Sequence, residues 1–157
     1  MEPEKQQTSI VIKNIYSQLV HVKTNGGLIN YSECFVYGFN MQYDNKYCHL
    51  VQERKNVVNN IPYILGAIGR TCNDLGLPPL TSLVINKSTG KCGIGVITSN
   101  EKIPEDERID FAENVDRPAV YACNNYPDPN SQQGQAFISR VIDHLLFKGV
   151  TIVRYKE

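Results

Sequence analysis

The most regular pattern of apolar and polar positions lies in the middle of the chain. Apolar side chains recur there at the spacing of one helical face, at Ile61, Ile64, Leu65, Ile68, Cys72 and Leu75. This spacing predicts a helix over 61–75. Pro62 is tolerated in the first turn of such a helix, Gly76 can close it, and Pro78-Pro79 prevent its continuation.

The segments before this helix have weaker patterns. Apolar positions within 9–24 predict a helix that ends at the glycine pair 26–27, because glycine readily adopts the left-handed conformation of a helix cap. We expect a short extended piece over 28–30 and two helical turns over 31–37. A further short helix is possible over 44–52.

Two runs rich in β-prone residues follow the central helix, at 80–86 and 91–97, with a short connection at 87–90 between them. Such a connection, ending in glycine, is typical of a β-hairpin, and Gly90 can supply the positive φ angle of a type I turn with a bulge. We therefore predict a hairpin over 80–97.

The composition changes in the last third of the chain. Between 101 and 116 seven acidic residues stand against two basic ones. The Pro-Glu-Asp-Glu run at 104–107 predicts a helix start, because acidic side chains favour the positive end of a helix dipole. We expect an extended segment over 118–123, a last helix that ends at Gly149, and a strand over 150–153.

These elements predict an α+β fold in a single domain over 1–157. A winged-helix-like three-helix core with a β-hairpin wing would occupy 10–97, and a C-terminal α/β extension over 98–157 would pack on the same core. The order helix, short strand, helix, helix, hairpin is that of a winged helix. In that fold the third helix enters the DNA major groove and the hairpin tip touches the backbone.

Four stretches of the chain are similar to a known family, at 15–19, 27–33, 65–70 and 77–84. Over about residues 10–97 the chain resembles the DNA-binding domain of O6-alkylguanine-DNA alkyltransferases and alkyltransferase-like proteins. The glycine-rich run from Leu77 to Gly95 also resembles small uncharacterised proteins of prophage and defence neighbourhoods. The resemblance implies a winged-helix fold and contact with nucleic acid.

The chain departs from this family at its reactive motif. Alkyltransferases carry a Pro-Cys-His-Arg box whose cysteine takes the alkyl group. Here Pro79-Leu80-Thr81-Ser82 stands where the box would fall, so the nucleophile and its histidine are absent. We therefore expect a protein that is not an enzyme and that carries no cofactor.

The overall charge is balanced, so electrostatic arguments must be local. The 157 residues include sixteen basic and sixteen acidic side chains, which excludes the strongly basic field of a histone-like nucleic-acid coat. From 53 to 91, five basic residues stand against two acidic ones, a net charge of +3. Surface cations that only keep the domain soluble would give the same count.

The candidate nucleic-acid contacts come from this locally basic region. They are Arg54, Lys55, Tyr63, Arg70, Asn73, Lys87, Ser88 and Lys91. Lysines beside the hairpin turn would bind phosphates, and Arg70 would be available for a base edge. So few cations predict weak, salt-sensitive binding of a double-stranded nucleic acid. The outer face of the central helix, with Gly66 and Gly69, equally fits close packing of another element.

The five cysteines, Cys34, Cys48, Cys72, Cys92 and Cys123, include no C-x-x-C pair and predict neither a disulfide framework nor a zinc site. Three of them have apolar neighbours and fit small core positions, at Cys34, Cys72 and Cys123. Cys92, beside the hairpin turn, is expected to be exposed. The polar first seven residues and the lack of a long apolar run predict a cytoplasmic protein without membrane contact.

Two other functions fit the sequence. The acidic segment from Glu101 to Asp116, or the C-terminal helix, could bind a host protein if the chain belongs to a phage or mobile element. Alternatively, a small molecule such as a nucleotide could bind between the central helix and the C-terminal segment. A solvated helix face explains the acidic residues equally well.

Overall fold

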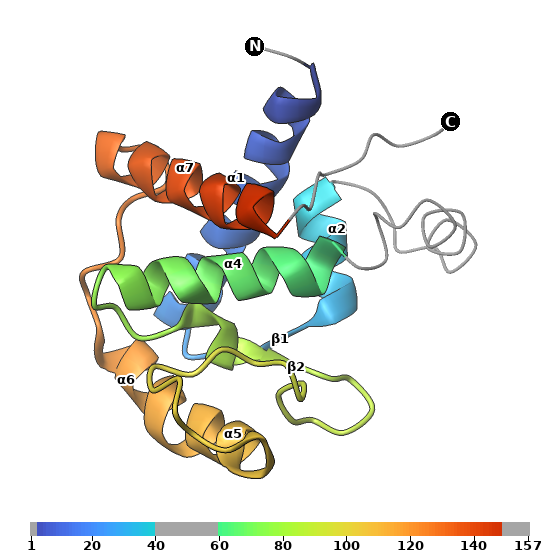
Figure 1. Cartoon of the computed structure of the whole chain (residues 1–157), viewed down its shortest axis with the longest axis vertical. Helices are drawn as coiled ribbons and strands as arrows, with labels where there is room; N and C mark the ends of the chain where they lie inside the picture. Colours follow the sequence, from blue (N-terminus) through green and yellow to red (C-terminus); the bar gives the residue numbers. More distant parts are fainter. Residues whose placement is uncertain (1–2, 40–59, 149–157) are drawn as a thin grey trace.

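The computed structural model describes residues 3–39 and 60–148 (Figure 1). In chain order its elements are α1 (Pro3–Thr24), β1 (Ile29–Asn30), α2 (Tyr31–Phe39), α4 (Asn60–Asp74), the 3-10 turn η1 (Leu80–Leu83), β2 (Val84–Ile85), α5 (Glu105–Phe111), the π-helical turn η2 (Ala112–Asp116), α6 (Arg117–Ala122) and α7 (Gln132–Phe147). The fold is mostly helical with one small two-stranded sheet, which confirms the α+β class. Within the described ranges no helix is long and apolar enough to cross a membrane.

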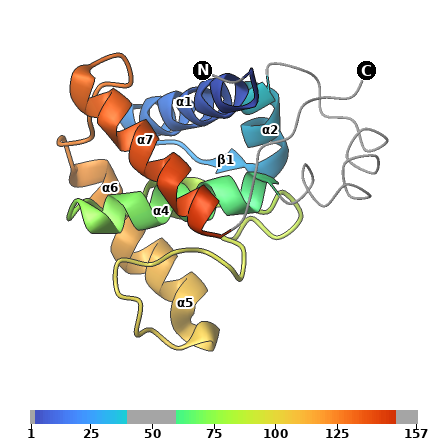
Figure 2. The same cartoon turned by 45° about the horizontal axis from the view of Figure 1, so that its top comes forward.

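Helices from both ends of the chain share one buried cluster. Side chains of α1, α4, η1, α6 and α7 all contribute to it. Tyr16 of α1 stacks on Phe137 of α7 with ring centroids 4.4 Å apart, and the Tyr16 hydroxyl donates a hydrogen bond of 2.6 Å to the carbonyl of Pro127. The helix α7 packs against both α4 and α1 (Figure 1, Figure 2). The segment after residue 98 is therefore part of this core.

The helices α1 and α4 end where their glycines predict. Gly26 and Gly76 both have positive φ angles, of 67° and 69°. After α4, the N–H of Leu77 bonds to the carbonyl of Cys72 at 2.8 Å and the N–H of Gly76 bonds to that of Asn73 at 3.1 Å. This pair of bonds is the Schellman motif, which satisfies the last carbonyls of a helix. The same pair closes α1.

The predicted hairpin over 80–97 is wrong. The strands β1 and β2 pair in parallel instead, with Ile29 opposite Val84 and Asn30 opposite Ile85. All four residues of η1 are buried, so Leu80–Leu83 turns into the core and cannot alternate sides as a strand does. The second run, 91–97, forms turns and no strand. The hairpin wing predicted for a winged-helix fold is therefore not formed.

A compact loop, residues 86–99, replaces the hairpin. It closes through a bond of 2.7 Å from the N–H of Asn86 to the carbonyl of Lys91, and a bond of 2.8 Å from the N–H of Gly90 to the carbonyl of Asn86. Gly90 has a φ angle of 69°. The glycine turn is confirmed, although the strands that it was expected to join are not formed.

The C-terminal third differs from prediction at one described segment. Residues 118–123, expected to be extended, mostly belong to the helix α6, which continues directly from α5 and η2. The helix start after Pro104 is confirmed. The helix α7 begins at Gln132, where the Ser131 hydroxyl accepts a bond of 3.0 Å from the N–H of Gly134. The helix expected over 44–52 and the strand over 150–153 lie outside the described residues.

The hydrogen bond from Tyr16 to Pro127 ties the C-terminal segment to α1. Tyr16→Phe keeps the stacked ring and leaves the Pro127 carbonyl without this donor, so we expect the free energy of unfolding to fall by about 1 kcal/mol. Urea unfolding followed by circular dichroism measures this change. Tyr37→Phe, on a side chain that is 46% exposed, is the matched control and should leave the midpoint unchanged. Equal midpoints for both variants would contradict the role of this bond.

Candidate nucleic-acid interface

Fewer residues on the outer face of α4 are exposed than the sequence indicates. Tyr63 is 47% exposed, and Gly66 and Arg70 are half-buried. Ala67 is only 2% exposed. Gly69 is also buried, and a Cβ placed on it would meet the side chain of Ile97. The small residues of this face therefore serve partly to pack the 86–99 loop, and the exposed part runs from Tyr63 over Gly66 to Arg70.

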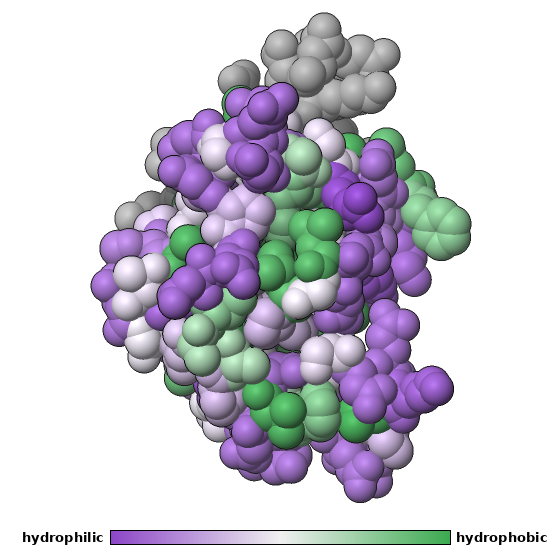
Figure 3. Space-filling model, turned by 90° about the vertical axis from the view of Figure 1, so that its left-hand side faces the viewer, coloured by the Kyte–Doolittle hydropathy of each residue, from purple (hydrophilic) through white to green (hydrophobic). Residues whose placement is uncertain are grey.

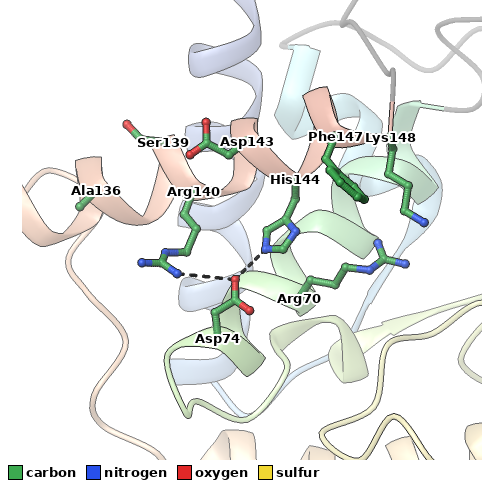
Figure 4. Close-up of a pocket in the computed structure, with 9 residues that line it drawn as sticks. All are labelled: Arg70, Asp74, Ala136, Ser139, Arg140, Asp143, His144, Phe147 and Lys148. Carbon is green, nitrogen blue, oxygen red and sulfur yellow. Dashed lines mark hydrogen bonds and ion pairs between the residues drawn. The ribbon is translucent and has the colours of Figure 1, made fainter.

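Arg70 lies back along α4, above Gly66. A Cβ on Gly66 would stand 3.1 Å from Nη1 of Arg70, so glycine leaves the space that the guanidinium uses. Arg70 borders a groove of about 990 Å³ between α4 and α7 (Figure 4). Across the described residues, no carboxylate forms an ion pair with Arg70. Within these residues its guanidinium is not neutralised by a carboxylate.

The same groove holds an internal cluster of charges. Oδ2 of Asp74 lies 2.7 Å from Nε2 of His144 and 3.8 Å from Nη1 of Arg140 (Figure 4). These contacts join the end of α4 to α7. They engage the carboxylate of Asp74, which stands one helical turn from Arg70. Asp74 is thus engaged away from Arg70.

Asn73 has a structural partner. Its Nδ2 donates a hydrogen bond of 3.0 Å to the carbonyl of Thr98 and so links α4 to the end of the 86–99 loop. We therefore leave Asn73 out of the interface.

The remaining predicted contacts that the structure describes lie on the tip of the 86–99 loop. Lys87, Ser88 and Lys91 are all exposed there. Arg54 and Lys55 lie outside the described residues. A pocket lies between α4 and this loop, and Asn86 and residues 93–97 line it on the loop side.

This pocket has a volume of about 350 Å³. Its walls come from α4, β2, η1, the start of α2 and the 86–99 loop. They combine apolar side chains with a few polar groups: Leu65, Val84, Val96, Tyr31, Thr81 and Asn86. Ile94, at 66% exposure, also lines the pocket and presents an apolar side chain to solvent. Apolar walls with a few polar groups are typical of ligand pockets.

Thr81 is the unusual residue of the pocket. Its side-chain oxygen is buried and has no hydrogen-bond partner in the described part of the chain, and the residue is only 4% exposed. An unpaired buried hydroxyl costs free energy. Ser82 carries a second unpaired buried hydroxyl.

Sequence reasoning missed Tyr31, Thr81 and Ile94 as candidate contacts. Tyr31 lies in the stretch 27–33 and Ile94 in the run from Leu77 to Gly95, but neither stretch marks its residue as a contact. One signal did exist for Thr81, because it falls in the stretch that replaces the Pro-Cys-His-Arg box of the family that the chain resembles. The adjacent hydroxyl residues at that point indicate a polar site, at Thr81 and Ser82.

The prediction that Cys92 is exposed is wrong. Cys92 is 1% exposed, because its thiol points inward onto η1 and donates a bond of 3.3 Å to the carbonyl of Ser82. Burial raises the pKa of this thiol, against the opposing effect of Arg117. Cys34 and Cys72 are confirmed as core residues, and burial raises the pKa of each thiol to about 12. The core position predicted for Cys123 is wrong, because this residue is only partly buried. Cys48 lies outside the described residues.

The acidic segment divides into an outward and an inward part. The carboxylates of α5 face solvent, at Glu105, Asp106, Glu107 and Asp110. Glu113 is half-buried and Asp116 is 2% exposed, and both bind the 86–99 loop. Only the first group can form an exposed acidic surface.

A different side of the molecule carries exposed apolar side chains. Figure 3 shows the face at the left-hand ends of α4 and α7 in Figure 1, where apolar side chains form a broken band among polar ones. Leu75, which follows the last turn of α4, is 44% exposed. Tyr63 lies in the first turn, so this side is at the opposite end of α4 from the pocket.

Across residues 3–39 and 60–148, no group of three or more His, Cys, Asp or Glu side chains is arranged to hold a metal ion. No protein-family model, no curated protein and no solved structure matches the chain. Functional inference therefore rests on the pocket and the surface around it.

Proposed function

We propose that the protein is a non-enzymatic nucleic-acid-binding protein. Its contact surface comprises the exposed face of α4 from Tyr63 to Arg70, the pocket beneath it, and the tip of the 86–99 loop. The observation that carries the proposal is a pocket between α4 and the 86–99 loop whose lining includes Thr81, a residue with an unpaired buried hydroxyl.

The two sides of the pocket supply the two kinds of contact that nucleic acids need. The lining includes Pro62 and Asn86, which precede Tyr63 and Lys87 in the chain. Lys87 and Lys91 suit phosphate contacts, and the half-exposed ring of Tyr63 suits stacking on a base. Ile94 adds an apolar side chain of the kind that some proteins insert between base steps.

The pocket suits one unpaired base. Its volume of about 350 Å³ is near the lower end of the range for ligand pockets, which is roughly 300–1,000 Å³. Proteins that hold an extruded base read it by hydrogen bonds to its polar edge and by contacts with apolar side chains. Here Thr81 and Asn86 offer polar groups, and Leu65 offers an apolar wall. The resemblance to alkyltransferase-like proteins, without the reactive cysteine, agrees with binding that is not followed by a reaction.

The charge of this surface predicts modest affinity. From 60 to 98 the chain carries Arg70, Lys87 and Lys91 against Asp74, and Asp74 is bound by α7. If each of these cations contacts one phosphate, the logarithm of the association constant should fall with the logarithm of salt concentration with a slope of roughly −3.

Lys91 tests the phosphate contacts. Lys91→Ala removes one cation from the loop tip, so we expect binding to a short DNA duplex to weaken about fivefold at low salt and the salt slope to become shallower by about one. Fluorescence anisotropy at several salt concentrations measures both quantities. Lys13→Ala removes an exposed cation from α1 and should change neither. If the two variants bind alike, the loop tip is not the contact surface.

Thr81 tests the pocket. Thr81→Val replaces a buried hydroxyl that has no described partner by a methyl group of the same shape, so the free protein should be equally stable or more stable. We expect affinity for DNA to fall about tenfold, because the ligand loses its hydrogen-bond partner. Thermal unfolding and anisotropy measure the two effects. A loss of stability with unchanged affinity would contradict the proposed role of Thr81.

A second candidate is a protein-binding role for α5. Its outward carboxylates, from Glu105 to Asp110, lie next to Val115, which is 50% exposed. Such a surface suits a basic partner, such as a host protein of a phage or mobile element. Specific retention of a protein by the wild type, lost in Glu105→Lys and unaffected by Lys91→Ala, would favour this role.

A further inference from the structure

The outer wall of the pocket is a segment without regular secondary structure. Residues 93–97 line the pocket, and the only backbone hydrogen bond among them in the described structure is the 3.1 Å bond from the N–H of Val96 to the carbonyl of Gly93. No described strand pairs with this wall. Its position therefore depends on side-chain contacts. Val96 is buried beside Cys92 and Ala112, Ile97 packs on Gly69, and further contacts hold the two ends of the wall.

The first anchor of the wall is Cys92. Its N–H donates a hydrogen bond of 3.0 Å to Oε2 of Glu113, and its sulfur accepts one of 3.4 Å from Nη2 of Arg117. Nε of Arg117 also donates a bond of 2.9 Å to the carbonyl of Ser82, which accepts from the Cys92 thiol as well. Nη2 of Arg117 lies 3.7 Å from Glu113. One compact group thus joins the wall to η1 and α6.

The second anchor is Ser99, just beyond the other end of the wall. Its N–H donates a bond of 3.0 Å to Oδ2 of Asp116, and its hydroxyl donates one of 2.5 Å to Oδ1. Asp116 is 2% exposed, so this carboxylate is directed entirely to the loop. The wall is therefore held between two anchors that belong to the same short stretch of chain.

That stretch is the π-helical turn η2 and the first residue of α6. Glu113, Asp116 and Arg117 stand at i, i+3 and i+4, a spacing that places side chains on one side of a helix. Single π-helical turns within α-helices often occur at functional sites. Here the turn directs two carboxylates and one guanidinium toward one loop.

We propose that Glu113, Asp116 and Arg117 are positioning residues for nucleic-acid binding, which hold the wall of the pocket in its binding position. This inference rests on the proposed function. Charge alone would predict the opposite effect of removing Glu113 on binding. Carboxylates near a polyanion repel it, so their removal should strengthen binding. If Glu113 acts as an anchor, its removal weakens binding instead.

Two substitutions of Glu113 separate these effects, because both remove the same charge. Glu113→Ala removes the acceptor for the N–H of Cys92, and Glu113→Gln keeps an oxygen that can accept it. We expect affinity for a short DNA duplex to fall about tenfold in Glu113→Ala and to recover most of the way in Glu113→Gln. The salt slope should stay at its wild-type value in both variants, because no phosphate contact is lost. Glu107→Ala, at an exposed carboxylate of α5, is the charge-matched control and should bind at least as tightly as the wild type.

Arg117→Lys provides a variant of unchanged net charge. Lysine cannot reproduce the two directed bonds from Nε and Nη2, so the anchor is weakened while the charge remains. We expect weaker DNA binding than in the wild type. This result keeps the proposal testable if Glu113→Ala does not fold.

Alkylation of Cys92, read by mass spectrometry of the free protein, tests the anchor without nucleic acid. We expect faster alkylation of Cys92 in Glu113→Ala and Arg117→Lys than in the wild type, with Cys34 and Cys72 still protected. Wild-type affinity and unchanged Cys92 alkylation in both variants would overturn the inference and leave the proposed function standing. Tighter binding by Glu113→Ala, equal to that of Glu107→Ala, would also overturn it. A wild-type protein that binds no nucleic acid would instead overturn the proposed function, and the inference with it.

Discussion

The burial of Leu80–Leu83 as a single 3-10 turn is the constraint on which the interface depends. Each of these four residues is at most 4% exposed, so the turn is held within the core. It places Thr81 at the pocket and turns the carbonyl of Ser82 toward Cys92 and Arg117. It also places β2 beside β1. The chain then leaves the core as the 86–99 loop. The pocket and the position of the loop thus follow from how one buried segment is packed.

The elements that could be predicted from the sequence are those that depend on nearby residues. The period of apolar positions located α4, and the glycines at 26 and 76 located the ends of α1 and α4, because a left-handed cap is a local requirement. The hairpin over 80–97 could not be judged in the same way. Val84–Ile85 has high β-propensity, but its partner is β1, more than fifty residues earlier, and pairing over that distance has no local signal. The helical state of 118–123 was likewise missed, because this short segment simply continues α5 and η2.

The exposed cations of the candidate site could be predicted from the sequence. The pocket could not, because it depends on the packing of distant segments. Lys87, Ser88 and Lys91 are exposed together, as their place beside a glycine turn indicates. The pocket was not predictable, because its walls come from segments that are far apart in the sequence. Cys92 was misplaced for a related reason: the direction of its thiol is set by η1 and Arg117, not by its own polar neighbours.

The distribution of charge links the fold to the proposed function. Cations lie at the loop tip and on α4, and most acidic residues of 101–116 face solvent on α5. The two innermost acidic residues, Glu113 and Asp116, bind the loop that carries the cations. Nucleic acid would therefore meet the face of the loop opposite to these carboxylates, which makes a net-neutral protein compatible with a polyanionic ligand.

An NMR titration with a short DNA duplex, read at side-chain methyl groups, tests the location of binding most directly. We expect the largest shifts at the methyl groups of Thr81, Ile94 and Ile97, and none at Ile109 of α5. Shifts confined to Ile109 and Val115, or no shifts at all at saturating duplex concentration, would contradict nucleic-acid binding at the pocket.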